Sequence, residues 1–334
     1  MLAYVARLPG LRAVGERCGR QLGTRAISSI AEALARRSSL RFVRSLVARL
    51  ETAHQPGDEE LVVLDGMAVT LPRTQRHGCA KFNNKTVGGG VVWAYLVGAA
   101  REVCPVKVLK IVEGAWSDAR VMRDVALHAR GPVYVMDRGF AACALFEQWL
   151  AQEVRFIARL RVNMLREDDM QRVLSPPRRI GALALELDAL VRLGGARVRA
   201  HPTVRVIVAR LRSGERLILA TERMEWSAER VLEAYRKRWH IERFHRLLKD
   251  TLGLSHLYSF QSTGIAFLIC TALLTVLLLY FAQRDPHGAT IELLRRMLMT
   301  VRAALGLGTP WKRNSCIRPR NKKRPTNKLK TTGR

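Results

Sequence analysis

Short apolar runs bounded by turn residues punctuate the middle of the chain. The runs LVVLDG (61–66) and GPVYVMDRGF (131–140) are predicted to be buried strands, because brief continuous apolar runs between turn signals are typical of strands covered on both faces. Each strand is followed by an aspartate, Asp65 in the first run and Asp137 in the second. The pattern therefore predicts two carboxylates, each at the carboxyl end of a buried strand.

Helical and extended patterns alternate around these two runs. We expect strands over 88–100, 104–114 and 154–163, and helices over 117–129, with Ser117 as the N-cap, and around 142–152. Residues 163–222 are rich in Arg, Pro and Gly and contain alternating apolar runs, which predicts an antiparallel, strand-rich insertion. The expected fold class is α/β.

The stretch YRKRWHIERFHRLLK (235–249) lies in a long helix that we expect to start after Ser227 and end near Lys249. At about 100° per residue, four polar side chains fall within an arc of roughly 60°. They are Tyr235, Arg238, Glu242 and Lys249, and the apolar side chains Ile241, Phe244, Leu247 and Leu248 lie opposite. A lone Glu among arginines is ordinarily an intrahelical ion pair, but that interpretation does not explain the clean separation of the two faces.

If this helix packs beside the sheet, Glu242 joins Asp65 and Asp137 in one acidic cluster. Three carboxylates would repel one another unless hard divalent cations neutralise them, and oxygen ligands suit Mg²⁺ or Mn²⁺. Two such ions would activate a hydroxyl and stabilise the leaving oxygen of a phosphodiester. Arg138 and Arg159 are candidates for phosphate contacts or, equally, for structural ion pairs.

The charge of the chain indicates a polyanionic partner. Lys and Arg outnumber Asp and Glu by 57 to 28, which gives a formal net charge of +29. Such a balance favours binding to phosphate backbones, although charge alone does not separate DNA from RNA or anionic lipid. The six cysteines have neither disulfide-framework nor zinc-finger spacing, and a reducing cytosol fits this pattern best.

Segments outside the predicted catalytic region differ in character. Apolar residues at helical spacing with arginines between them predict basic amphipathic helices over 25–51. Residues 307–334 hold no acids and few apolar residues, which predicts a disordered basic tail. Residues 264–282 are nineteen uncharged, mostly apolar positions, which is about the minimum length for a membrane span. A fully buried core helix has the same signature, and we favour that interpretation over a membrane protein.

The spacing of Tyr235, Arg238, Glu242 and Lys249 resembles the Y-x-x-R-x-x-x-E-x-x-x-x-x-x-K signature of the insertion-sequence transposases of the family numbered four. Three other motifs resemble the same family in the same order: KFNNKTVGGGVVW (81–93), VMDRGF around Asp137, and the FIARLRVN that follows it. The resemblance covers roughly residues 60 to 280. After Asp65 the chain departs from the family, with Gly-Met in place of a small hydroxyl residue and threonine.

This resemblance implies a ribonuclease H-like fold with a β-rich insertion between the second Asp and the Glu. It implies that Asp65, Asp137 and Glu242 are the catalytic residues and the ligands of Mg²⁺ or Mn²⁺. Contacts to DNA are expected from Tyr235, Arg238, Arg246 and Lys249. The implied reaction is hydrolytic nicking, attack of the freed 3′-hydroxyl on the other strand, often as a hairpin, and transfer into target DNA.

The resulting expectation is a bacterial, cytoplasmic, nucleoid-associated transposase that acts on terminal inverted repeats as a homodimer. We expect a helical region over 1–58, a catalytic core over 59–255 with its insertion at about 163–222, a helical region over 256–306, and the tail over 307–334. The short first region could be a truncated DNA-binding domain. Two alternatives stay open: an inactive DNA-binding remnant and, less favoured, a single-span membrane protein.

Overall fold

One mixed sheet of eight strands forms the framework of the described part of the chain. The computed structural model describes residues 32–33, 36–52, 58, 60–67, 80–82, 85–87, 117–165, 170–194, 199–246, 248–249, 254 and 262–282. The strands of this sheet are β1 (Leu61–Leu64), β4 (Val133–Met136), β5 (Arg155–Arg159), β6 (Met170–Ser175), β7 (Arg178–Ile180), β8 (Leu183–Arg192), β9 (Thr203–Arg210) and β10 (Arg216–Thr221). A separate two-stranded sheet pairs β2 (Ala80–Phe82) with β3 (Lys85–Val87).

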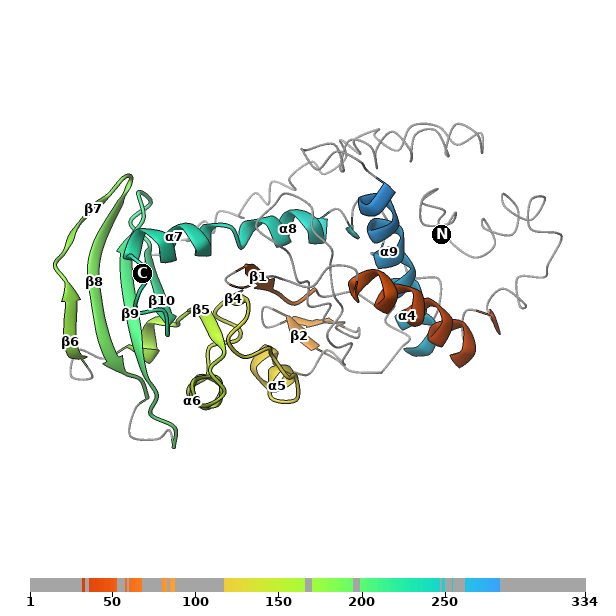
Figure 1. Cartoon of the computed structure of the whole chain (residues 1–334), viewed down its shortest axis with the longest axis horizontal. Coiled ribbons are helices and arrows are strands. Elements are labelled where there is room, and N and C mark those ends of the chain that lie inside the picture. The colour runs from red at the N-terminus through yellow and green to blue at the C-terminus, as the bar shows by residue number, and fades with distance from the viewer. Residues whose placement is uncertain are drawn as a thin grey trace, which may run out of the picture.

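The large sheet has a parallel half and an antiparallel half, in the order β1-β4-β5-β10-β9-β8-β6. Strands β1, β4 and β5 run parallel, and β10 joins β5 in the antiparallel direction. In the register of the first pair, Leu64 lies opposite Met136, the last residue of each strand. Strands β6 to β10 account for most of the chain between 170 and 221, as Figure 1 shows at the left of the view.

Helices cover both faces of the sheet (Figure 1). They are α4 (Arg37–Thr52), α5 (Asp118–Met122), α6 (Cys143–Ala151), α7 (Ala228–Arg236), α8 (Trp239–Arg246) and α9 (Ser262–Ala282), with a 3₁₀ turn η1 at Val162–Met164. Val63 and Val135 pack toward α7, α8 and α9, whereas Leu64 and Met136 pack toward α5 and α6. This double covering explains why β1 and β4 are apolar at every position instead of alternating.

The α/β class and the strands before Asp65 and Asp137 are confirmed. The helix predicted around 142–152 is also present as α6. Ser117 caps α5 as predicted, since its Oγ accepts a hydrogen bond from the backbone N–H of Arg120, but the helix ends at Met122 and not near residue 129. The strands predicted over 88–100 and 104–114 lie outside the described residues.

The prediction of one continuous helix from Ser227 to Lys249 is wrong. The segment forms two helices, α7 and α8, with a break at residues 237–238. Around the division the backbone N–H groups of Lys237, Arg238, His240 and Ile241 donate to the carbonyl three residues earlier. Such tight 3₁₀ bonding changes the rotation per residue, so positions before and after the break no longer share one continuous face. No proline or glycine marks this break in the sequence.

The long apolar stretch at 264–282 lies within α9. One side of α9 packs into the core shared with α7 and α8, and the other side packs against the amphipathic helix α4. Ile269 and Leu273 join the core on the face of the sheet that α7 and α8 cover, whereas Cys270, Leu274 and Leu277 pack against Val43 and Val47 of α4. In the part of the chain that the structure describes, no helix meets the length and apolarity needed to cross a membrane. The predicted tail over 307–334 and most of the first 35 residues lie outside the described residues.

Candidate active site

Asp65 and Asp137 lie side by side because the strands that precede them are adjacent and parallel. Each follows the last residue of its strand, and those last residues, Leu64 and Met136, are register partners. Asp65 accepts a hydrogen bond from the backbone N–H of Gly66 at 2.9 Å, and Asp137 accepts one from the N–H of Arg138. The backbone ladder therefore fixes the two carboxylates at neighbouring positions on one sheet edge.

Arg238 connects this sheet edge to Glu242. Its Nη2 donates to Glu242 Oε1 at 2.5 Å, and its Nη1 lies 3.6 Å from Asp65 Oδ2. Burial lowers the pKa of the guanidinium, but the neighbouring Tyr235, Asp65, Glu242 and Asp137 outweigh this effect, so its pKa lies above the ordinary value. The three sequence-predicted acids are thus gathered around one permanently charged arginine.

The carboxyl group of Asp65 is a weak acid in this surrounding. Its side chain is 17% exposed, and burial, followed by the negative charges of Asp137 and Asp118, raises its pKa from 3.8 to about 7 despite the opposing effect of Arg238. The attraction of Arg238 therefore does not offset the effect of burial on this carboxyl group. A strongly perturbed carboxyl group at a strand end is a typical mark of a functional site.

Asp118 is a carboxylate of this site that the sequence analysis did not identify. Burial, and then the negative charge of Asp137, raise its pKa from 3.8 to about 6, while Arg161 opposes the shift. Its Oδ1 is completely buried and has no hydrogen-bond partner. Its sequence signal, an acid directly after the N-cap Ser117, was interpreted only as the start of a helix.

His245 is a second group near this site that the sequence analysis did not identify. Its Nδ1 lies 3.8 Å from Asp65 Oδ2. Burial, followed by the positive charges of Lys249 and Arg238, lowers its pKa from 6.5 to about 3, so the imidazole is neutral near pH 7. His245 therefore packs against the site without adding charge to it.

The other predicted DNA contacts differ in exposure. Tyr235 is buried, with a hydroxyl that has no hydrogen-bond partner and lies near Asp137, Arg159 and Arg238. Lys249 is partly buried and close enough to His245 to affect its pKa, and Arg246 is exposed. Of the tryptophans nearby, Trp239 is 53% exposed, whereas Trp226 is buried.

A basic pocket opens beside Asp137. It has a volume of about 730 Å³ and is lined by Arg138, Gly139, Arg159, Leu160, Arg161, Val162, Glu215 and Arg216. Arg159 donates to Glu215 at 2.5 Å, so the structural ion pair considered for Arg159 is present. Arg138 is exposed. Four arginines against one glutamate give this pocket an excess of positive charge that suits an anionic ligand.

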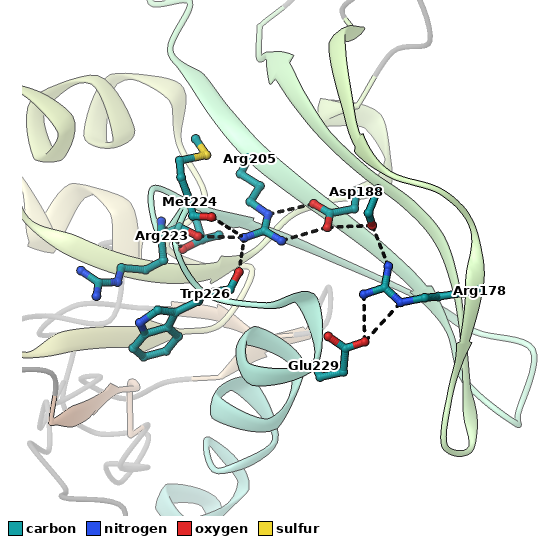
Figure 2. A network of polar contacts seen from close by, with 9 residues as sticks. Arg178, Asp188, Arg205, Arg223, Met224, Trp226 and Glu229 are labelled. Atoms are coloured by element: carbon teal, nitrogen blue, oxygen red, sulfur yellow. Dashed lines mark hydrogen bonds and ion pairs between the residues drawn. The ribbon is translucent and has the colours of Figure 1, made fainter.

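The start of α7, the helix that leads to Arg238, is held by a buried polar network (Figure 2). Arg205 of β9 donates from Nε and Nη2 to the two oxygens of Asp188 on β8, each at 2.8 Å. Its Nη1 donates to the carbonyl oxygens of Arg223 at 2.9 Å and Trp226 at 2.5 Å. The antiparallel half of the sheet therefore fixes the segment that enters α7.

The chemistry of the site suits a hard divalent cation. In the part of the chain that the structure describes, no three His, Cys, Asp or Glu side chains lie close enough together to form a metal-binding group. Mg²⁺, however, is commonly bound by one or two carboxylates together with water and substrate phosphates. The oxygen-only donors, their mutual repulsion and the buried, unpartnered Oδ1 of Asp118 all fit such a cation.

Comparison with known proteins identifies the family. The cryo-EM structure of the piggyBac transposase synaptic complex with hairpin DNA is similar at 10% sequence identity and a TM-score of 0.42, covering 78% of this chain and 56% of that chain. This chain thus spans just over half the length of that protein. No curated protein matches. The family model described as "Transposase DDE domain" matches residues 56–278, more than half of the sequence, and the chain therefore belongs to the transposase DDE domain family.

Proposed function

We propose that this DDE transposase cleaves the ends of an insertion sequence and transfers them into target DNA, with Asp65, Asp137 and Glu242 as the catalytic metal ligands. The observation that carries the proposal is the convergence of the two strand-end carboxylates with Arg238, which also binds Glu242. Nicking would free a 3′-hydroxyl, and attack of that hydroxyl on the other strand would release the element through a hairpin.

We infer that the core around this site is ribonuclease H-like and spans residues 59–255. Three adjacent parallel strands with helices on both faces support this assignment. The antiparallel strands between 170 and 221 would be the insertion, flanked by helical regions over 1–58 and 256–306. In this arrangement the insertion contributes Arg205, which holds the segment before α7.

The cation, Mg²⁺ or Mn²⁺ and as two ions in our proposal, would polarise the scissile phosphate and lower the pKa of the attacking hydroxyl. Asp65 and Asp137 are already fixed by backbone hydrogen bonds, so binding requires little rearrangement of the sheet edge. Arg238 keeps its charge at any working pH and has the planar donor geometry that suits a phosphate. We propose that a DNA phosphate takes over part of its contact with Glu242.

We propose that DNA reaches the site across two basic surfaces. On one side Arg238, Arg246 and Lys249 would hold the transposon end, with the hydroxyl of Tyr235 as a further donor. On the other side the pocket formed by Arg138, Arg159, Arg161 and Arg216 would take the backbone of the neighbouring strand. Because two ends must be paired before transfer, the active assembly would be a homodimer in a synaptic complex.

The test is cleavage of duplexes that carry the inverted repeats found at the ends of the element. Wild-type protein is expected to nick them with Mg²⁺ or Mn²⁺ and not in EDTA. Asp137→Asn and Glu242→Gln should each lose cleavage by at least about 1,000-fold, on the scale of other essential catalytic groups, while retaining DNA binding. Glu147→Gln, an exposed change on α6, is the matched control and should leave cleavage unchanged. Full cleavage by either site variant would exclude the assignment.

A second candidate function is that of a DNA-binding remnant without catalysis. The specific observation that favours it is that Arg238 already bridges Asp65 and Glu242, while the described residues form no three-ligand metal group. The same assay separates the two functions. A remnant would bind DNA with a strong dependence on salt and would show no metal-dependent cleavage at any protein concentration.

A further inference from the structure

Asp118 lies in contact with the loop that follows Asp137. A Cβ atom at residue 139 would lie 1.9 Å from Asp118 Oδ2, so the carboxylate occupies the space left free by the missing side chain of Gly139. Gly139 comes two residues after Asp137, in the turn in which the Phe140 N–H donates to the Asp137 carbonyl at 3.1 Å. The close approach requires glycine at this position, because any side chain would push Asp118 away.

The position of Asp118 is costly for the metal-free protein. Its Oδ1 is fully buried with no hydrogen-bond donor, which is unfavourable for a polar atom and more so for a charged one. Arg161 is the nearby cation, but it donates no hydrogen bond to this oxygen.

A second incompletely satisfied polar group lies at the same place. Tyr235 is only 8% exposed, and its hydroxyl makes no hydrogen bond of normal geometry, although Arg238 and Asp137 lie close enough to act on its pKa. Asp118 and Tyr235 come from opposite faces of the sheet, from α5 and α7 respectively. The fully buried Asp118 Oδ1 without a donor, together with this hydroxyl, indicates that the site is arranged for a ligand that supplies positive charge and bound water.

We propose that Asp118 supports the divalent cation at the Asp65 and Asp137 site by binding it through a cation-bound water. The inference rests on the proposed metal-dependent function and adds a carboxylate to it. The cation-bound water would donate to Oδ1, which has no other donor. Gly139 is the positioning residue that gives Asp118 its access.

A purely structural role for Asp118 explains less. An acid in the first turn of a helix stabilises it modestly through the backbone N–H groups. In this protein Ser117, not Asp118, accepts the hydrogen bond from the Arg120 N–H, and no donor reaches Asp118 Oδ1. The carboxylate is turned to the loop after Asp137, where a cation and not the helix would use it.

The experiment measures Mn²⁺ binding to the full chain by the loss of the free-ion signal in electron paramagnetic resonance. Asp118→Asn is expected to weaken Mn²⁺ binding by about 10–100-fold, the range typical of groups that support a metal site. The matched control is Asp124→Asn, which changes an exposed aspartate just after the same helix and should bind as wild type does. Melting in EDTA provides a second readout, because Oδ1 has no donor to lose in the metal-free protein and the metal-free melting temperature of Asp118→Asn should not fall.

A second pair of variants keeps every charge and changes only geometry. Gly139→Ala should weaken Mn²⁺ binding by a similar factor, because its methyl group displaces the Asp118 carboxylate. Gly131→Ala is the control, since its Cβ would meet nothing closer than 3.8 Å. This pair keeps the inference testable even if Asp118→Asn fails to fold.

Three outcomes decide the matter. Weakened binding in Asp118→Asn and Gly139→Ala, with both controls unchanged, supports the inference. If Asp137→Asn loses Mn²⁺ while Asp118→Asn and Gly139→Ala bind like wild type, the inference fails and the proposed function stands. If wild-type protein binds no Mn²⁺ with or without DNA, the proposed metal-dependent function fails and the inference fails with it.

Discussion

The carboxylates of this protein that are shielded from solvent differ in how far they are paired. Asp188 is 2% exposed, and both its oxygens are paired with Arg205, while Ser175 adds a third hydrogen bond. Asp65 and Asp118 are half-buried, burial raises the pKa of both, and one oxygen of Asp118 has no partner. The fully paired carboxylate stabilises the fold, whereas the incompletely paired ones are those that we propose to serve the cation.

The two kinds of carboxylate lie in different halves of the sheet. The paired Asp188 lies in the antiparallel half, and its partner Arg205 holds the carbonyl groups of residues 223–226 just before α7 (Figure 2). Asp65 and Asp118 lie at the end of the parallel half. In the antiparallel half the buried charges are fully hydrogen-bonded, and these bonds hold the segment that leads into α7 and on to Arg238.

The largest loss of stability is expected when Arg205 is removed. Arg205→Met leaves Asp188 buried without its cation and frees three carbonyl groups, so we expect the free energy of unfolding to fall by about 3–5 kcal/mol. Urea unfolding followed by circular dichroism measures it. Arg210→Met, which breaks a half-exposed pair with Glu186, is the control and should cost less than about 1 kcal/mol.

The double variant Arg205→Met with Asp188→Leu sharpens the same point. It removes the buried charge together with its partner and should recover much of the lost stability, because apolar replacement of a buried pair is often nearly neutral. Equal loss in the single and double variants would mean that the carbonyl contacts, not the charge pair, carry the stabilisation.

The reverse effect is expected at Asp65 in metal-free protein. Its folded pKa of about 7 lies above its ordinary 3.8, so stability is fully present below pH 3.8 and is lost as the pH rises toward about 7. Asp65→Asn should remove this loss and raise the free energy of unfolding by about 2 kcal/mol at pH 8 in EDTA, and by less at pH 5. Melting curves at the two pH values test it. A lower stability of the variant at pH 8 would contradict the view that the charge is uncompensated.

The smallest effect is expected at the exposed end of the Arg205 network. Arg178 donates to Glu229 at 2.9 Å and to Ser175 at 2.8 Å, but both charged side chains are well exposed. Arg178→Gln should therefore cost no more than about 0.5 kcal/mol, and 1 M NaCl should abolish the difference from wild type. A cost near that of Arg205→Met would show that exposure does not separate the two ends of the network.

The sequence predicted those parts of the site that depend on local pattern. Continuous apolar runs located β1 and β4, and with them Asp65 and Asp137, because strands buried on both faces leave a strong local signal. Helical spacing grouped Arg238 with Glu242, which are in contact at 2.5 Å. The roles of these residues in catalysis and DNA binding remain predictions that the proposed variants test.

Contacts between segments far apart in the chain leave no local pattern in the sequence. Asp118 meets the turn after Asp137 only because α5 packs under the sheet, and His245 meets Asp65 only because α8 packs above it. The division between α7 and α8 likewise depends on a change of backbone hydrogen bonding without proline or glycine. Each of these features is set by tertiary packing, which a single sequence read by local periodicity does not contain.

The register between β1 and β4 bears on how far this sequence could change without losing its chemistry. Because main-chain hydrogen bonds hold the two strands in parallel, the separation of Asp65 and Asp137 does not depend on which apolar side chains fill the core beside them. Exchanges among valine, leucine and methionine that conserve volume in these strands would leave the two acids in place, because the backbone and not the identity of each apolar side chain sets their separation.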